Sequence, residues 1–143
     1  MKVYLVAGEP SGDKLGAELM AGLKSCAPYE LDFCGVGGFL MEEQGLTSLF
    51  PISEIAVMGI GEILAKYSFL KKRIKNTVDD ILRLKPDVLI TIDAPEFSLR
   101  VAKMVRKKIF INTIHYVAPT VWAWRPNRAK KISSYVDHIL ALF

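Results

Sequence analysis

The chain has 143 residues, of which 51% are hydrophobic and 24% charged, and its formal net charge is +4. These totals suit one globular domain. The mild positive charge favours an anionic ligand or membrane surface, but no basic motif indicates nucleic acid. Two cysteines, Cys26 and Cys34, exclude a disulfide framework, and no apolar stretch approaches the roughly 20 residues of a membrane-spanning helix.

Apolar runs and helical periodicities alternate along the chain. The apolar runs predict buried strands at residues 2–7, 30–34, 47–50, 88–92, 109–114 and 137–143. Helical spacing predicts helices at residues 14–25, 40–44, 62–84, 98–107 and 127–135. This alternation predicts the α/β class, as a Rossmann-like parallel sheet with helices on both faces. The last apolar run ordinarily leads into another element, so we expect residues 1–143 to be one domain of a longer protein.

The first strand is followed by Gly-Glu-Pro-Ser-Gly-Asp at residues 8–13. Glycines at such a turn let backbone N–H groups approach an anion, but the spacing is not that of a dinucleotide fingerprint. A turn with Ser11 or Asp13 capping the next helix is the favoured interpretation. Glu9 lies where it could bind sugar hydroxyls. Glycines at 35–38 permit either close ligand approach or a tight turn.

Asp93 follows the buried strand at residues 88–92. A carboxylate there is costly unless it is solvated or paired, and in a parallel sheet this position opens into a cleft. Asp93 is therefore a candidate general base. The alternative is that Asp93 is simply the N-cap of the next helix. Glu96 fits a first-turn partner of the helix dipole.

Residues 114–128 predict a loop that carries His115, both tryptophans and two arginines. His115 could act as a base or hydrogen-bond donor, or be structural. Trp122 could stack on a sugar or pack in the core. Arg125 and Arg128 could bind a phosphate or form a solvated basic face.

Residues 60–75 combine apolar and aromatic side chains with a cluster of lysines and one arginine. This mixture is typical of a helix lying in a membrane interface. An ordinary amphipathic helix packed on the sheet is the alternative. Phe69 lies off the main apolar face and is expected to be exposed, which favours a lipid role.

Five motifs in order make the chain resemble the N-terminal half of the lipid-A-disaccharide synthase family. They are Ala-Gly-Glu-Pro-Ser-Gly-Asp at 7–13, Gly-Val-Gly-Gly at 35–38, Ala-Val-Met-Gly at 56–59, Ile-Asp-Ala-Pro at 92–95 and His-Tyr-Val-Ala-Pro-Thr-Val-Trp-Ala-Trp-Arg at 115–125. The resemblance implies the N-terminal, acceptor-side domain of a GT-B type glycosyltransferase. The C-terminal domain, which would hold the nucleotide-sugar, is missing from these residues, so the chain alone should catalyse little.

The resemblance also implies the reaction and its setting. UDP-2,3-diacylglucosamine would be joined to 2,3-diacylglucosamine 1-phosphate with inversion, giving the β-1,6 lipid A disaccharide 1-phosphate and UDP. No cofactor or metal is expected, and nucleic acid is not an expected partner. The enzyme would be cytoplasmic and peripheral on the inner face of the inner membrane. The rival hypothesis is a stand-alone α/β module that binds a phospho-ligand or a lipid surface without catalysis.

The matching positions receive roles by the same resemblance. Asp93 is the expected catalytic base. The expected substrate-binding residues are Glu9, Ser11, Gly37, Met58, His115, Trp122 and Arg125. The expected contacts with acyl chains or the membrane are Ile60, Leu64, Tyr67 and Leu70.

Overall fold

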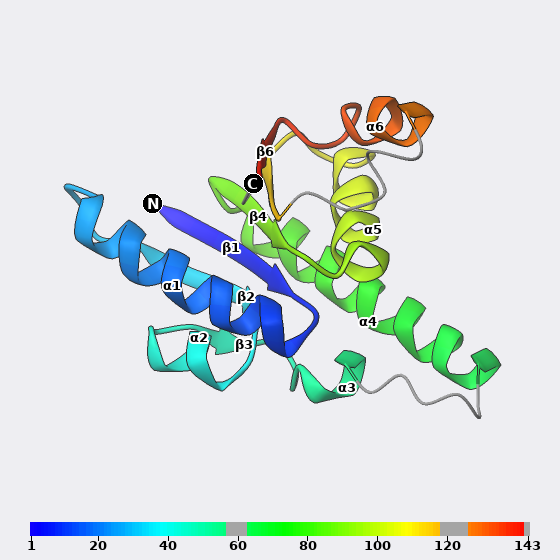
Figure 1. Cartoon of the computed structure of the whole chain (residues 1–143), viewed down its shortest axis with the longest axis horizontal. Coiled ribbons are helices and arrows are strands. Elements are labelled where there is room, and N and C mark those ends of the chain that lie inside the picture. Colours follow the sequence, from blue (N-terminus) through cyan, green and yellow to red (C-terminus); the bar gives the residue numbers. More distant parts are fainter. Residues whose placement is uncertain (57–62, 118–125, 142–143) are drawn as a thin grey trace.

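The structure is a computed structural model that describes residues 1–56, 63–117 and 126–141. Within these residues the strands form a six-stranded parallel sheet in the order β3-β2-β1-β4-β5-β6 (Figure 1). The strands are β1 (Lys2–Ala7), β2 (Asp32–Val36), β3 (Thr47–Ser48), β4 (Val88–Ile92), β5 (Asn112–Tyr116) and β6 (His138–Leu140). This strand order is that of a Rossmann-like sheet, so the predicted α/β class is confirmed.

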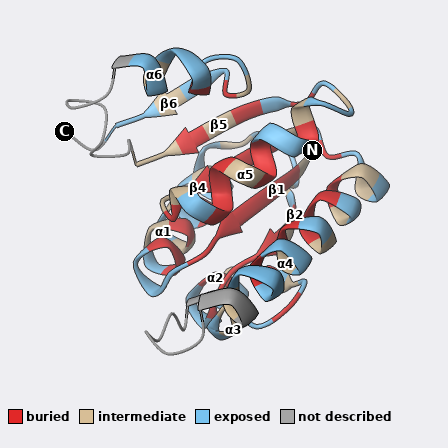
Figure 2. Ribbon diagram, turned by 90° about the vertical axis from the view of Figure 1, so that its right-hand side faces the viewer, coloured by how far each residue is buried: buried red, intermediate tan, exposed pale blue. Residues whose placement is uncertain are grey.

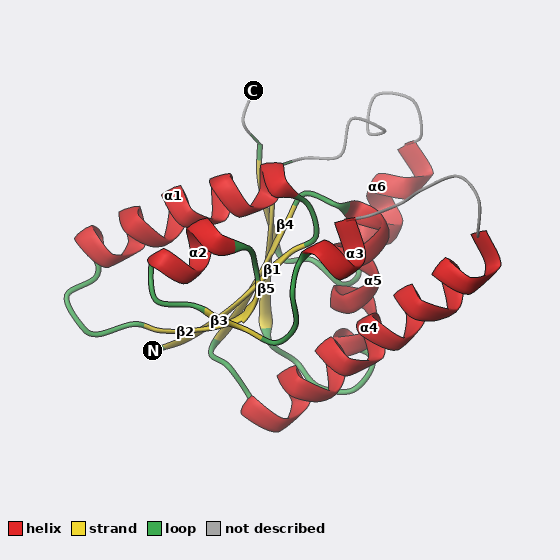
Figure 3. Cartoon of the chain, turned by 90° about the horizontal axis from the view of Figure 1, so that it is seen from below, coloured by secondary structure: helices red, strands yellow, loops and turns green. Residues whose placement is uncertain are grey.

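Helices cover both faces of the sheet (Figure 3). They are α1 (Pro10–Cys26), α2 (Phe39–Glu43), α3 (Ser53–Ala56), α4 (Ile63–Leu84), α5 (Pro95–Arg106) and α6 (Pro126–Ile132). Alternate residues of β1 point to opposite faces, as the pleat of a strand requires. Val3 and Leu5 pack in the core beneath α1 and α2, whereas Tyr4 joins the core beneath α4 and α5. The central strands are therefore buried on both sides (Figure 2).

The first turn differs from its predicted arrangement. Helix α1 begins at Pro10, with Glu9 as an N-cap whose side chain makes no capping hydrogen bond. Asp13 caps a different helix: its buried carboxylate accepts hydrogen bonds from the backbone N–H groups of Gly38, Leu40 and Met41, at 2.9–3.1 Å, at the start of α2. The capping hypothesis for Ser11 and Asp13 on α1 is wrong because Pro10 starts the helix one turn early.

Strand β5 is shifted along the chain relative to the prediction. Ile109 and Ile111 pack against the core near α5, and Phe110 is exposed, so pairing with β4 starts only at Asn112. The strand then continues to Tyr116, which places His115 inside the sheet rather than in the loop after it. No helix among the described residues is both long and apolar enough to cross a membrane.

Candidate functional site

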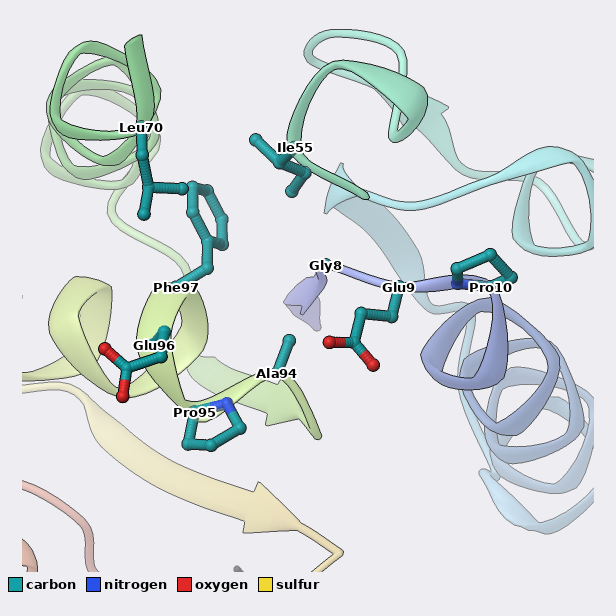
Figure 4. Close-up of a pocket in the computed structure, with 9 residues that line it drawn as sticks. All are labelled: Gly8, Glu9, Pro10, Ile55, Leu70, Ala94, Pro95, Glu96 and Phe97. Carbon is teal, nitrogen blue, oxygen red and sulfur yellow. The ribbon is translucent and has the colours of Figure 1, made fainter. Parts of the chain in front are cut away.

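The candidate site lies at the carboxyl ends of β1 and β4, the two neighbouring strands between which the strand order reverses. These two strands pair with each other, but β1 leads to α1 on one face and β4 leads to α5 on the other. Divergent connections of this kind leave a crevice in which doubly wound folds bind their ligands. A pocket of about 380 Å³ opens there (Figure 4). It is lined by Gly8, Glu9, Pro10, Ile55, Leu70, Ala94, Pro95, Glu96 and Phe97.

Gly8 brings the two loops into contact. A Cβ added at Gly8 would lie 2.9 Å from the Cβ of Ala94 and 3.7 Å from that of Phe97. Only glycine therefore allows the chain leaving β1 to rest directly on the chain leaving β4. The shape of the pocket depends on this close approach.

Replacing Gly8 with Ala is expected to destabilise the protein by about 1–3 kcal/mol, because the added methyl group must push the two loops apart. Urea unfolding measures this loss. Gly22→Ala is the matched control, since a Cβ at Gly22 meets no atom within 4 Å. Equal stability of the two variants would contradict the tight contact at Gly8.

Asp93 lies at the centre of the strained loop after β4. Asp93 and Ala94 both have left-handed backbone conformations, with φ of 47° and 42°. Ala94 is the N-cap residue of α5, and no side chain caps that helix, so the alternative interpretation of Asp93 as an N-cap does not hold. Two adjacent non-glycine residues in this region store strain, a feature that clusters at functional sites.

Hydrogen bonds orient Asp93 from two directions. Its backbone N–H donates to the carbonyl oxygen of Tyr116 at 3.0 Å. Its Oδ2 accepts a hydrogen bond of 3.3 Å from the hydroxyl of Ser11, a residue 82 positions earlier. The side chain of Asp93 is half-buried. The structure thus brings together two residues that the sequence predicted separately.

The pocket has a polar side and an apolar side. The carboxylate of Glu9 extends into it from the loop after β1 (Figure 4). Across the pocket lie Ile55, Leu70 and Phe97, all buried. Such a pocket suits a ligand with hydroxyl groups at one end and hydrocarbon at the other.

The residues of α4 that were predicted to contact acyl chains or the membrane differ in their exposure. Tyr67 and Phe69 are 48% and 38% exposed, as expected for Phe69. Leu70 is buried and lines the pocket, so it faces the pocket rather than the outer surface of α4. The side chain of Leu64 and all of Ile60 lie outside the described residues.

His115 is fully buried in β5, beside Thr91 of β4. The Nδ1 of His115 and the hydroxyl of Thr91 are 2.8 Å apart and hydrogen-bonded. The buried Nε2 has no hydrogen-bond partner among the described residues. Burial lowers the pKa of His115 to about 4, although the charge of Asp93 and the nearby backbone of Val117 act in the opposite direction. The ring is therefore neutral near pH 7 and is held by the sheet.

Lowering the pH from about 7 to about 4 is expected to destabilise the fold by about 3 kcal/mol through His115. The unfolded ring takes up a proton near pH 6.5, whereas the buried ring stays neutral down to about pH 4. This contribution is therefore complete above the unfolded pKa and is lost as the pH falls through the interval between the two values. Urea unfolding across this interval measures it.

The exposed His138 supplies the control for this pH dependence. In His115→Gln the free energy of unfolding should decrease less between about pH 6.5 and pH 4 than in the wild type. In His138→Gln the decrease should equal that of the wild type. A wild-type pH profile in His115→Gln would show that another group is responsible.

The remaining predicted residues are placed as follows. Gly37 lies at a separate opening of about 400 Å³ beside β3, and its N–H donates to the Ser48 hydroxyl at 3.1 Å. Met58, Trp122 and Arg125 lie outside the described residues. In the described part of the chain, no group of three or more His, Cys, Asp or Glu side chains is arranged to hold a metal ion.

Three contributors to the site were not identified from the sequence. Ile55 in α3 and Phe97 in α5 form pocket walls, but an apolar residue in a helix carries no signal of that role. Thr91 had a usable signal, since it is the one polar residue in the strand Val-Leu-Ile-Thr-Ile. A buried hydroxyl requires a partner, and the partner here is His115.

Known proteins resemble the chain over nearly all its length. A family model described as lipid-A-disaccharide synthetase matches residues 3–143. The lipid-A-disaccharide synthase of Ruegeria pomeroyi is 55% identical over 142 residues, which are 99% of this chain and 35% of that protein. The lipid-A-disaccharide synthase of Rhodopseudomonas palustris is 50% identical over 142 residues, which are 99% of this chain and 36% of that protein. The chain thus spans only about a third of the curated relatives it matches.

A solved structure shares the fold. The UDP-GlcNAc 2-epimerase from Neisseria meningitidis, crystallised with UDP-GlcNAc, superposes with a TM-score of 0.60. The match covers 99% of this chain and 40% of that one at 14% sequence identity. At this identity the likeness concerns the fold alone.

Proposed function

The chain belongs to the lipid-A-disaccharide synthetase family, and from this premise we propose that it is the N-terminal, acceptor-side domain of a GT-B type glycosyltransferase. The proposed reaction joins UDP-2,3-diacylglucosamine to 2,3-diacylglucosamine 1-phosphate. Its products are the β-1,6 lipid A disaccharide 1-phosphate and UDP. A C-terminal domain beyond these residues would hold the nucleotide-sugar, in keeping with the 35% of the Ruegeria protein that the chain spans.

One observation carries the proposal: Asp93, whose backbone is strained, directly precedes Ala94, and Ala94 lines a pocket that has an apolar wall. Asp93 is hydrogen-bonded to Ser11 at 3.3 Å, and the pocket next to it is closed by Ile55, Leu70 and Phe97. An acylated sugar has the matching chemistry, with hydroxyl groups for the polar end and hydrocarbon for the wall. A purely polar substrate would leave that wall without a partner.

The proposed mechanism assigns Asp93 the role of general base. The 6-hydroxyl oxygen of the acceptor bonds to the anomeric carbon of the donor, and Asp93 takes the proton of that hydroxyl group. The bond from that carbon to the UDP oxygen breaks, the anomeric centre inverts, and UDP leaves with the bonding electrons. Ser11 keeps Oδ2 of Asp93 in place, so that Oδ1 is left to receive the proton. Glu9 would hold other sugar hydroxyls.

The enzyme is proposed to work on the inner face of the inner membrane, because both substrates are lipids. Tyr67 and Phe69 are exposed on α4 near Lys71 and Lys72, which are also exposed. The Lys71 ammonium lies 5.5 Å from the centre of the Tyr67 ring. Aromatic side chains beside cations are suited to an anionic bilayer surface.

The direct test incubates the full-length protein with both lipid substrates and follows UDP release and disaccharide formation. We expect product only when both substrates are present, and no turnover from residues 1–143 alone. Binding of the acceptor without any product from the full-length protein would instead support a module that binds phospholipid-like ligands without catalysis.

A further inference from the structure

A second, smaller hollow lies beside the candidate site, between α5 and α6. It encloses about 180 Å³. Its lining consists of Pro95, Glu96, Leu99, Arg100, Lys103, Arg128, Ile132 and Tyr135. Leu99 and Ile132 are buried in a small apolar cluster that joins the two helices. This cluster fixes the separation of the helices and so gives the charged side chains above it a stable base. We call this hollow the α5–α6 groove.

The charges that line the α5–α6 groove are unbalanced. Three cationic side chains, Arg100, Lys103 and Arg128, face a single acid. That acid, Glu96, receives Arg100 Nη2 at 3.2 Å and Arg128 Nη2 at 3.7 Å, so it holds guanidinium groups from both helices at the groove. Lys103 has no ion pair with any described residue. The groove therefore has two positive charges in excess.

The type of side chain indicates the type of ligand. Arginine presents several N–H donors in a planar fork that matches the oxygens of a phosphate, and two such forks suit a phosphomonoester. The ion pairs to Glu96 are solvent-exposed, with 63% of the Glu96 side chain accessible. Exposed pairs of this kind are weak, so a dianion can replace the carboxylate as their partner.

The groove and the pocket at the switch point are neighbours. Pro95 and Glu96 line both of them, and they directly follow Asp93 and Ala94 in the chain. A single ligand can therefore reach across the first turn of α5. With its attacking hydroxyl at Asp93, such a ligand would carry its phosphate on the α5 side of the pocket.

We propose that the α5–α6 groove is the subsite for the 1-phosphate of the acceptor sugar, bound by Arg100, Lys103 and Arg128. This assignment rests on the proposed function, because it needs an acceptor that has both a free 6-hydroxyl group and a phosphomonoester. It explains why three cationic side chains of α5 and α6 line the same groove. It also gives the acceptor an orientation, since the phosphate is held in the groove while the hydroxyl group faces Asp93.

The test measures steady-state kinetics of the full-length enzyme carrying Arg100→Gln or Arg128→Gln. Each change should raise the KM for 2,3-diacylglucosamine 1-phosphate about 10-fold, the usual loss for one charge-assisted hydrogen bond, with kcat and the donor KM almost unchanged. With 2,3-diacylglucosamine, which lacks the phosphate, the variants should perform as the wild type does. Lys131→Gln is the matched control, because this exposed lysine of α6 does not line the groove.

Two further measurements, vesicle co-sedimentation and the donor KM, distinguish binding of the acceptor phosphate from binding of other anions. Co-sedimentation with phosphatidylglycerol vesicles should be equal for wild type and both arginine variants. Weaker vesicle binding with an unchanged acceptor KM would overturn the subsite and assign the cations to the membrane. A rise in the donor KM alone would overturn it in favour of the UDP phosphates. Absence of disaccharide from the wild type would instead refute the proposed function itself.

Discussion

Asp93→Asn in the full-length enzyme is expected to lower kcat by about 10²–10⁴-fold, the usual contribution of a general base. The amide is nearly the same size, can still accept the hydrogen bond from Ser11, and cannot take the proton of the attacking hydroxyl group. Substrate binding should change little, so the acceptor KM should stay close to that of the wild type. Single-turnover and steady-state assays of disaccharide formation measure both quantities.

Asp32→Asn is the matched control for this loss. Asp32 is an exposed carboxylate at the start of β2, at the opposite end of the sheet from the pocket. Its replacement removes the same charge and should leave kcat unchanged. Turnover near the wild-type rate in Asp93→Asn would rule out Asp93 as the base, and the exposed Glu9 would then be the next carboxylate to test.

Asp13→Ala is expected to lower the free energy of unfolding by about 3 kcal/mol. The carboxylate accepts three backbone hydrogen bonds, from Gly38, Leu40 and Met41, and it is only 8% exposed. Removing it leaves three N–H groups at the start of α2 without their acceptor in a place that water reaches poorly. Urea denaturation at about pH 7 measures the loss.

The control for Asp13 lies on the same helix. Glu18 is exposed on α1, so Glu18→Ala should change stability by less than about 0.5 kcal/mol. Asp13→Asn should fall between the two, because an amide oxygen replaces one carboxylate oxygen and its NH₂ group cannot accept the remaining bonds. A loss below about 1 kcal/mol in Asp13→Ala would show that α2 does not depend on this cap.

Much of the fold could be predicted because its signals are local. The apolar runs at residues 2–7 and 88–92 coincide with β1 and β4, since a strand buried on both faces is apolar along its whole length. The same reasoning placed Asp93 at a strand end that opens into a cleft. The predicted start of β5 at residue 109 was wrong. Residues 109–111 are apolar because they pack beside α5, and β5 begins only at Asn112.

The amino-acid sequence by itself determined the alternation of strands and helices, the buried faces and the family motifs, because these depend on neighbours within a few residues. Only the tertiary structure decided which side chains meet. Ser11 reaches Asp93 across 82 positions, and Asp13 caps a helix that starts 26 residues later. Those pairs depend on β1 lying between β2 and β4 in the sheet. Strand order follows from the packing of the whole chain, which no local pattern of residues contains.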